Sequence, residues 1–207
     1  DTALVGAYVD DVGANTNQGS AYVFLREGTT WSQQAQLTAP DGVAGDEFGV
    51  SVAIDGDTAL VGTWGMISGQ VRSGSAYVFT RSATTWSLQQ KLTASDGVPG
   101  DHLAYSVSLV GDTALVGAPW DDIGANTDQG SAYVFVRSGT TWSEQAHFIA
   151  SDGAAGDRFG IAVALNGNKA LVGAYIDDVE ADVDQGTAYF YTERHQIYLP
   201  QIQRIAP

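Results

Sequence analysis

The segment from Phe48 to Thr63, FGVSVAIDGDTALVGT, alternates larger apolar residues with small ones on both sides of a short polar break. In its first half the larger residues fall at every second position: Phe48, Val50, Val52 and Ile54. Because successive side chains of a strand point to opposite faces, the pattern predicts strands over 48–54 and 58–63. The break, Asp55-Gly56, predicts a type I′ hairpin turn, which the equivalent Val110-Gly111 fits poorly.

The same phrase recurs at a spacing of 55 or 56 residues. Its leucine is found at Leu4, Leu60, Leu115 and Leu171, and the tyrosine of a following SAYVF or TAYFY run at Tyr22, Tyr77, Tyr133 and Tyr189. A fourth run, of the type WSLQQKLTA, carries the polar residues typical of an exposed edge strand. A fixed period with several independent anchors indicates a repeated structural unit of four strands.

Antiparallel four-stranded units of this length that stack radially form a β-propeller. We therefore predict an all-β fold, a β-propeller of four-stranded antiparallel blades with about four repeats of 55–56 residues. The predicted units are 1–47, 48–102, 103–158 and 159–192, and residues 193–207 form a C-terminal tail. The tail is a candidate last edge strand, although Pro200 weakens that assignment. We prefer an open arc of a larger propeller to a closed four-bladed ring.

One glycine closes the second strand of every repeat, at Gly6, Gly62, Gly117 and Gly173. A position that always lacks a side chain indicates close approach of another backbone or a sharp bend. We expect a side chain at any of the four to collide with the adjacent blade.

The amino-acid composition of the chain disfavours several classes of binding partner. The chain has 207 residues, a net charge of −15, 25 glycines and no cysteine, so disulfides and thiolate chemistry are excluded. Nucleic acid and anionic membranes are poor partners for such an acidic chain. No apolar run approaches the roughly 18 residues of a membrane helix. The chain opens in the middle of a repeat and shows no signal peptide, so we interpret it as a segment of a longer protein.

The runs GDEFG…LVGT, GDRFG…LVGA and LVGAPW resemble the FG-GAP repeat, which builds the β-propeller of integrin α-subunits and of many bacterial surface proteins. The resemblance extends to about Thr192. It implies an extracellular or cell-surface module that binds a protein or carbohydrate ligand, as a monomer or as part of a longer multidomain chain. The family's calcium loop, D-x-D-x-D-G, is absent here, because two-residue turns cannot supply six to eight oxygen ligands. That site is therefore not transferred to Asp55, Asp57 or Asp112.

The loops after the second and fourth strands share one rim, and 17 of the 24 acidic residues fall in them by our count. Three of the loops after the second strand carry a paired aspartate followed by further aspartate or asparagine. Carboxylate and amide oxygens are ligands for a hard cation. The candidate Ca²⁺ ligands are Asp10, Asp11, Asn15, Asn17, Asp121, Asp122, Asn126, Asp128, Asp177, Asp178, Asp182 and Asp184. The alternative is an ordinary acidic turn.

The aspartate of each GD pair (Asp46, Asp101, Asp157) is expected instead to accept backbone N–H bonds within a turn.

Four aromatic residues at the same rim, Tyr8, Trp64, Trp120 and Tyr175, are candidate ligand contacts. The alternative is that they fill gaps between blades. Trp31, Trp86 and Trp142 repeat regularly and are expected to pack.

The function predicted from these observations is a non-enzymatic binding or adhesion module. His102, His147 and His195 occupy non-equivalent positions, and no catalytic motif is present. Two alternatives stay open, an accessory or catalytic propeller segment of a secreted hydrolase and a structural spacer.

Overall fold

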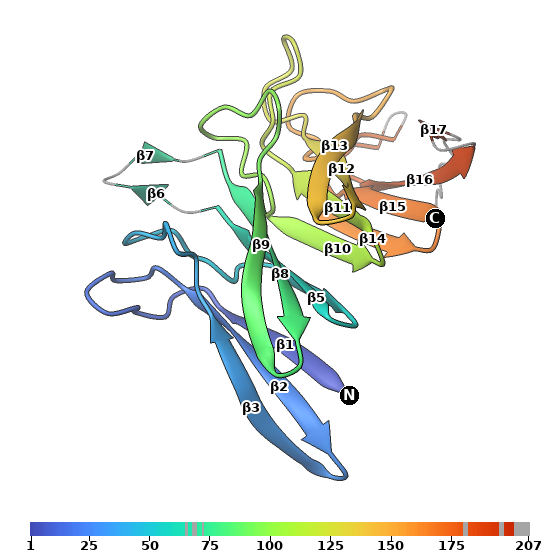
Figure 1. Cartoon of the computed structure of the whole chain (residues 1–207). Helices are drawn as coiled ribbons and strands as arrows, with labels where there is room; N and C mark the ends of the chain where they lie inside the picture. Colours follow the sequence, from blue (N-terminus) through green and yellow to red (C-terminus); the bar gives the residue numbers. More distant parts are fainter. Residues whose placement is uncertain (65, 68–69, 72, 180–181, 195–196, 201–207) are drawn as a thin grey trace.

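The computed structural model of the chain is all-β, with four antiparallel sheets of three or four strands and one small two-stranded ribbon (Figure 1). It describes residues 1–207 except 65, 68–69, 72, 180–181, 195–196 and 201–207. No described residue lies in a helix, and so none belongs to a helix long and apolar enough to cross a membrane. The predicted fold class is confirmed.

Each sheet is one repeat, and we call the sheets blades one to four. Blade one contains β1 (Thr2–Ala7), β2 (Ser20–Glu27) and β3 (Thr30–Leu37). Blade two contains β4 (Val52–Asp55), β5 (Thr58–Thr63), β8 (Ser75–Ser82) and β9 (Thr85–Leu92). Blade three contains β10 (Ser106–Val110), β11 (Thr113–Ala118), β12 (Ser131–Ser138) and β13 (Thr141–Phe148).

Blade four contains β14 (Ala162–Asn166), β15 (Lys169–Ala174), β16 (Thr187–Arg194) and β17 (Ile197–Pro200). In this last sheet β17 pairs with β16, so the tail supplies the fourth strand, with Pro200 at its end. A small ribbon of β6 (Met66–Ile67) and β7 (Gln70–Val71) projects from blade two (Figure 1).

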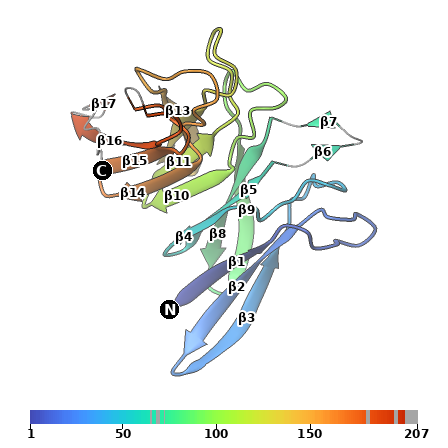
Figure 2. The same ribbon diagram turned by 180° about the vertical axis from the view of Figure 1, so that it is seen from behind.

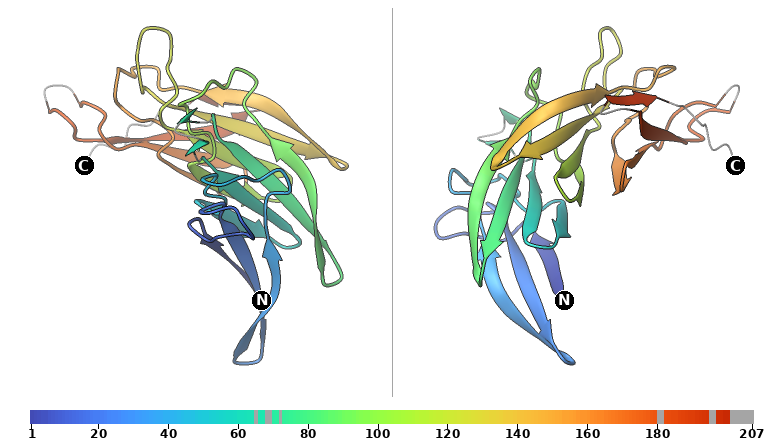
Figure 3. Two further views of the ribbon diagram at one scale, coloured as in Figure 1. Left: turned by 90° about the vertical axis from the view of Figure 1, so that its left-hand side faces the viewer. Right: turned by 45° about the vertical axis from the view of Figure 1, so that its right-hand side comes forward.

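The blades follow one another along an arc whose two ends do not meet (Figures 2 and 3). Each pair of consecutive blades shares one hydrophobic cluster, which gives three clusters among the described residues. The sheets are not closed into a ring, in agreement with the predicted open arc.

The two faces of a blade differ in side-chain size. In blade two the face toward blade one, which we call the leading face, carries Val61, Tyr77 and Phe79. The face toward blade three, the trailing face, carries Leu60 and the smaller Ala76 and Val78. Because large side chains of one sheet meet small ones of the next, the sheets can pack closely.

The repeated glycine permits this packing at three of its four positions. A Cβ built on Gly6, Gly62 or Gly117 would overlap a carbonyl oxygen of the next blade, namely that of Gly49, Ala104 or Gly160. The expectation is wrong for Gly173, where the nearest atom to a built Cβ is the Ala162 oxygen at 3.7 Å. No described residue packs on the trailing face of blade four at that point.

The hairpin between the first and second strands lies one residue later than predicted. Asp55 pairs with Thr58, so the turn residues are Gly56 and Asp57. Only Gly56 has a positive φ, of 56°, which is the pattern of a type II′ turn. Val110 is accordingly the last residue of a strand, and the third hairpin does not differ from the others.

The first strand is also shorter than predicted, because the FG pair lies in the turn before it. Gly49 and Gly160 adopt φ values of 97° and 92°. Ala104 keeps the same left-handed backbone at φ 70° although it has a side chain. The replacement of FG by Leu103-Ala104 therefore changes the side chains and preserves the local fold.

Two of the repeated glycines, Gly117 and Gly173, allow a test of the close backbone approach between blades. We expect Gly117→Val to lower the free energy of unfolding by about 2–4 kcal/mol, because the new side chain has to displace a backbone carbonyl. Gly173→Val makes the same change in an open position and should cost less than about 1 kcal/mol. Urea denaturation of both variants measures the difference, and equal losses would contradict the close approach.

A second pair tests backbone strain in the turn between the third and fourth strands. Ala83 is exposed and has φ 56°, where the equivalent residues are Gly28 and Gly139 with φ 61° and 65°. Since left-handed backbone is strained for alanine, Ala83→Gly should stabilise the fold by about 0.5–1 kcal/mol. Gly139→Ala should destabilise it by a similar amount. Thermal melting of the two variants should show shifts of opposite sign.

Candidate functional site: the loop rim

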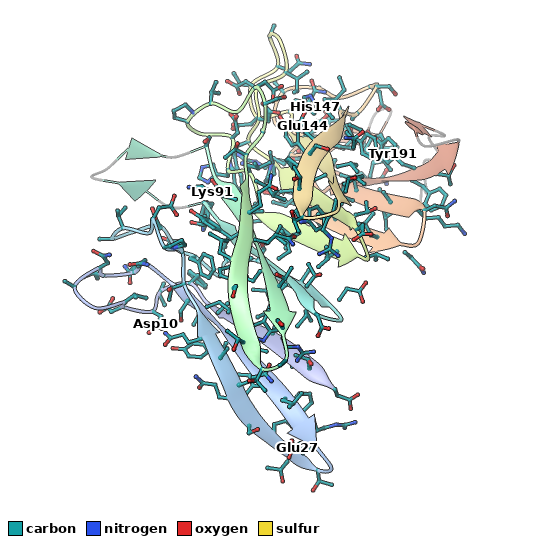
Figure 4. All side chains as sticks on the ribbon, in the orientation of Figure 1. Asp10, Glu27, Lys91, Glu144, His147 and Tyr191 are labelled. Atoms are coloured by element: carbon teal, nitrogen blue, oxygen red, sulfur yellow. The ribbon has the colours of Figure 1, made fainter. Side chains whose placement is uncertain are left out.

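The loops at one end of the blades form a continuous surface, which we call the loop rim. It consists of the described residues of the loops that follow the second strand of a blade (8–19, 64–74, 119–130, 175–186) and of the loops between blades (38–51, 93–105, 149–161). Asp10 marks the rim of blade one and Glu27 its opposite, hairpin end (Figure 4).

Backbone hydrogen bonds join the two kinds of loop. Phe48 N donates to Gln18 O at 2.8 Å, and Phe159 N donates to Gln129 O at the same distance. At the middle interface Leu103 N donates to Ser73 O at 2.7 Å. Each loop that leaves a blade is thus joined by backbone hydrogen bonds to the segment that enters the next one, across all three interfaces.

The first aspartate of each pair is engaged by the third strand of its own blade. Asp10 accepts hydrogen bonds from the hydroxyls of Ser20 (2.6 Å) and Tyr22 (2.8 Å). These hydrogen bonds hold the pKa of Asp10 below its usual value. Tyr133 donates to Asp121 at 3.0 Å, and Tyr189 donates to Asp177 at 2.9 Å.

The second aspartate of each pair stabilises a left-handed residue of its own loop. Asp11 accepts the backbone N–H of Asn17 at 2.8 Å, and Asn17 has φ 52°. The pairs Asp122 with Asp128 and Asp178 with Asp184 repeat this contact at 2.9 and 2.7 Å. A carboxylate that caps an N–H group in this way is typical of a tight polar loop.

The asparagine of the loop forms a third, separate contact. Asn15 Nδ2 donates to Gln18 Oε1 at 2.7 Å and to Gly42 O at 3.3 Å. Asn126 repeats this with Gln129 and Gly153. Asp182, at the equivalent position of blade four, pairs with Val179 through backbone hydrogen bonds of 3.0 Å.

The predicted Ca²⁺ ligands are therefore close in sequence but have distinct roles. Among the described residues no three histidine, aspartate or glutamate side chains gather as a metal site would require. The geometry favours the alternative of hydrogen-bonded turns, and Ca²⁺ binding stays a prediction.

The GD aspartates accept backbone N–H groups as expected. Asp46, Asp101 and Asp157 are buried and bond to Val43 N, Val98 N and Ala154 N at 2.8, 2.6 and 2.6 Å. Burial raises the pKa of Asp101 to about 6, the hydrogen bond from Val98 opposes this, and the charges of Asp121, Asp122 and Asp96 add to the rise.

Blade three carries a histidine between two of the rim carboxylates. The ring of His147 stacks on Tyr133 at 4.4 Å, with Nδ1 3.6 Å from Asp96 and Nε2 3.7 Å from Asp121. Burial lowers the pKa of His147, but Asp121, Asp96 and Glu144 together raise it above its usual value. In Figure 4 Glu144 and His147 lie together on blade three. Lys91 takes the equivalent place in blade two, with Nζ 2.7 Å from Asp41.

One feature occurs once in the part of the rim that the structure describes, and we call it the aromatic cluster: Trp64, His102, Tyr105, Trp120 and Arg158. The ring centroids of Trp64 and Trp120 are 6.2 Å apart, and that of His102 lies 4.7 and 4.8 Å from them. Tyr105 meets both tryptophans edge to face, at 5.6 and 5.0 Å. The Arg158 guanidinium lies 4.7 Å from the Trp120 ring, the distance of a cation–π contact.

Two polar atoms of the cluster are buried without a hydrogen-bond partner among the described residues, Trp64 Nε1 and His102 Nδ1. Such groups are costly unless a partner satisfies them. The cluster therefore joins blades two, three and four by apolar contact and retains unused hydrogen-bonding capacity.

The structure brings together only two of the four predicted aromatics. Tyr8 and Tyr175 are exposed on blades one and four and lie outside the cluster. Sequence reasoning missed His102, Tyr105 and Arg158 as cluster members. The signal was their departure from the repeat, because His102 stands where the other repeats have Glu47 and Arg158.

The backbone conformation at the position of His102 is the same in the equivalent residues of the other blades, although their side chains differ. Glu47, His102 and Arg158 have φ values of 54°, 54° and 58°.

The regular tryptophans pack as predicted in two blades. Trp142 is buried and Trp86 is half-buried. The expectation is wrong for Trp31, which is 47% exposed because no described segment covers the leading face of blade one.

These observations define the protein as an open array of β-propeller blades with a hydrogen-bonded loop rim. A family model described as FG-GAP repeat matches residues 31–79, 86–135 and 142–191. The three matches cover well over half of the chain, each running from the last strand of one blade to the third strand of the next. The chain therefore belongs to the FG-GAP repeat family, as its resemblance predicted. A search of curated proteins gave no match.

The raised pKa of Asp101 predicts how the stability of the fold depends on pH. A carboxyl whose folded pKa is about 6 rather than 3.8 stabilises the fold fully below pH 3.8, and this contribution is lost as the pH rises through 6. Asp101→Asn should therefore be more stable than the wild type at pH 8, by on the order of 1–2 kcal/mol, and not at pH 4. Urea denaturation at both pH values measures this.

Asp11→Asn provides the control, because it removes one charge from the equivalent, exposed position of the rim in blade one, whose charge is not among the causes of the Asp101 shift. A gain at pH 8 that is equal in both variants would show that general charge relief, and not the burial of Asp101, is responsible.

Proposed function

We propose that this chain is a non-enzymatic extracellular binding module that presents its loop rim to a protein or glycan ligand. Membership of the FG-GAP family supports the general class, since these repeats occur in integrin-like extracellular binding modules. The observation that carries the specific proposal is the aromatic cluster. Among the described residues it occurs once, whereas the acidic turns around it repeat and have structural partners.

The charge and the aromatic side chains of the rim favour some classes of ligand over others. A net charge of −15 disfavours anionic ligands and favours uncharged sugars or basic protein segments. Half-buried aromatic side chains such as Trp120 offer an apolar surface, and tryptophan and arginine are enriched among the residues that dominate binding energy. We assign the central contact to Trp120 and Arg158.

The proposal is tested with the immobilised chain in a glycan and cell-binding screen, with and without Ca²⁺. Once a ligand is found, Trp120→Ala should weaken its binding by at least about tenfold. Trp31→Ala is the matched control, since it removes an exposed tryptophan from the hairpin end of blade one and should leave affinity unchanged. Circular dichroism and melting of both variants verify that the fold is retained.

Other results would support different functions. Ligand capture that is undiminished in Trp120→Ala would move the contact away from the aromatic cluster. Absence of any ligand would favour a structural spacer, and turnover of a bound glycan would favour the hydrolase alternative.

A further inference from the structure

The hairpin between the first and second strands of blades two, three and four has one backbone conformation but a different residue before its glycine. The turns are Asp55-Gly56, Val110-Gly111 and Asn166-Gly167, and their glycines have φ values of 56°, 56° and 59°. The chain has five asparagines, and Asn166 is the one that a glycine follows. Blade four therefore combines the common turn with a dipeptide that the other two turns lack.

An asparagine that precedes glycine can react with its own main chain. The nitrogen of the next residue attacks the side-chain carbonyl carbon, and glycine leaves this approach open because it has no side chain. A Cβ built on Gly167 would meet no atom within 4 Å, so the space around the turn is open as well. Asn166 is exposed, and so is Asp55 at the same position of blade two, which has a neighbouring blade on each side. The exposure is thus a property of the turn.

The glycine nitrogen that would act as the nucleophile is held in blade three and available in blade four. Gly111 N donates to Oδ2 of Asp55 in the preceding blade at 2.6 Å. For Gly167 the corresponding residue of the preceding blade is Val110, whose side chain has no hydrogen-bond acceptor. In the part of the chain that the structure describes, no residue accepts a hydrogen bond from Gly167 N.

We infer that Asn166 is a site of spontaneous modification, at which the backbone nitrogen of Gly167 displaces ammonia from the Asn166 side chain. A bond forms between Gly167 N and Asn166 Cγ while the nitrogen loses its proton. The bond between Cγ and Nδ2 breaks, ammonia leaves, and a five-membered succinimide ring remains.

Water then opens the ring at one of its two carbonyl carbons. Addition at Cγ restores the main chain and leaves an aspartate at position 166. Addition at the backbone carbonyl carbon leaves isoaspartate, in which Cβ and Cγ become part of the main chain. Water is the only co-reactant, and no group is oxidised or reduced.

The hairpin sets the rate of the first step. An extended residue does not present its side-chain carbonyl to the next nitrogen, so the pairing of Asn166 with Lys169 has to open first. This pair is the last of the β14–β15 ladder, and the ends of elements open at a lower free energy than their centres. The preceding residue is held, because Leu165 N donates to Ser108 Oγ of blade three at 2.9 Å. The opening is therefore limited to the turn.

The two products have different consequences for blade four. The aspartate form has the Asp-Gly turn that blade two already contains, so its fold should be retained. The isoaspartate form has a longer main chain at the end of β14 and cannot keep its register with Lys169. Either form adds a negative charge beside that lysine. The inner hairpin of blade four thus changes with the age of the molecule.

The modification is tested by incubation of the folded chain in mildly alkaline buffer, followed by tryptic digestion and mass spectrometry. Cleavage after Arg158 and Lys169 releases residues 159–169, and fragment spectra distinguish Asn166 from Asn168 in this peptide. Asn166 should gain the mass of an exchange of NH2 for OH, and enzymatic methylation specific for isoaspartate should label the peptide. The remaining asparagines, Asn15, Asn17 and Asn126, should stay unchanged over the same period.

The chain incubated in denaturant shows that the reaction is detectable. An Asn166 that is converted there but stays unchanged in the folded chain would overturn the inference. Conversion of the remaining asparagines to the same extent in the folded chain would overturn it as well.

Val110→Asn is the matched control for the free nitrogen, because it creates the same dipeptide in blade three, where Asp55 holds Gly111 N. The new asparagine should be converted at least about tenfold more slowly than Asn166, since the hydrogen bond has to break first. Addition of Asp55→Ala to this variant should remove the difference. Equal rates at the two turns of the Val110→Asn chain would contradict the role of the free N–H group.

Melting measurements test the consequence for the fold. Asn166→Asp reproduces the aspartate product and should melt like the wild type. A chain enriched in isoaspartate by incubation should melt at a lower temperature, in proportion to its isoaspartate content. An isoaspartate form that melts like the wild type would contradict the loss of register at Lys169.

Discussion

The arrangement of the blades depends on the approach of one backbone to another at the end of each second strand. The carbonyls of Gly49, Ala104 and Gly160 lie in the space that a side chain on Gly6, Gly62 or Gly117 would fill. Because the sheets meet at this distance, the large residues of a leading face reach the small ones of the trailing face opposite. The three apolar clusters, and the connections between loops above them, follow from that spacing.

The arrangement of the loop rim results from the same stacking of consecutive sheets. The loop that leaves one blade is hydrogen-bonded to the segment that enters the next, so the positions of the two depend on each other. Paired aspartates take part in this framework in two ways, one bonding to the hydroxyls of the third strand and the other to a backbone N–H group. A high density of negative charge is thus compatible with an ordered set of loops, because several of the carboxylates have a specific hydrogen-bond partner.

Alternation of large and small residues and a fixed period were sufficient to predict the strands, their grouping into blades and the side on which the loops lie. The hairpin register was predicted one residue too early, because Asp55-Gly56 fits one turn type and Gly56-Asp57 fits another, and only cross-strand pairing distinguishes them. The aromatic cluster could be predicted only in part. Its members come from three blades, and contact between Trp64 and His102 depends on how the sheets are placed relative to one another.

The left-handed residue that precedes the first strand of a blade keeps one backbone conformation while the chemistry of its side chain differs between blades. Its backbone conformation is nearly identical in three blades, while its side chain is acidic in Glu47, aromatic in His102 and basic in Arg158. The conformation is maintained by neighbouring backbone bonds and so does not constrain the identity of the side chain. A gene that duplicates this blade therefore gains a position at which each copy can acquire a different recognition chemistry without a new loop structure, and the same position is a natural point at which to redesign the specificity of the surface.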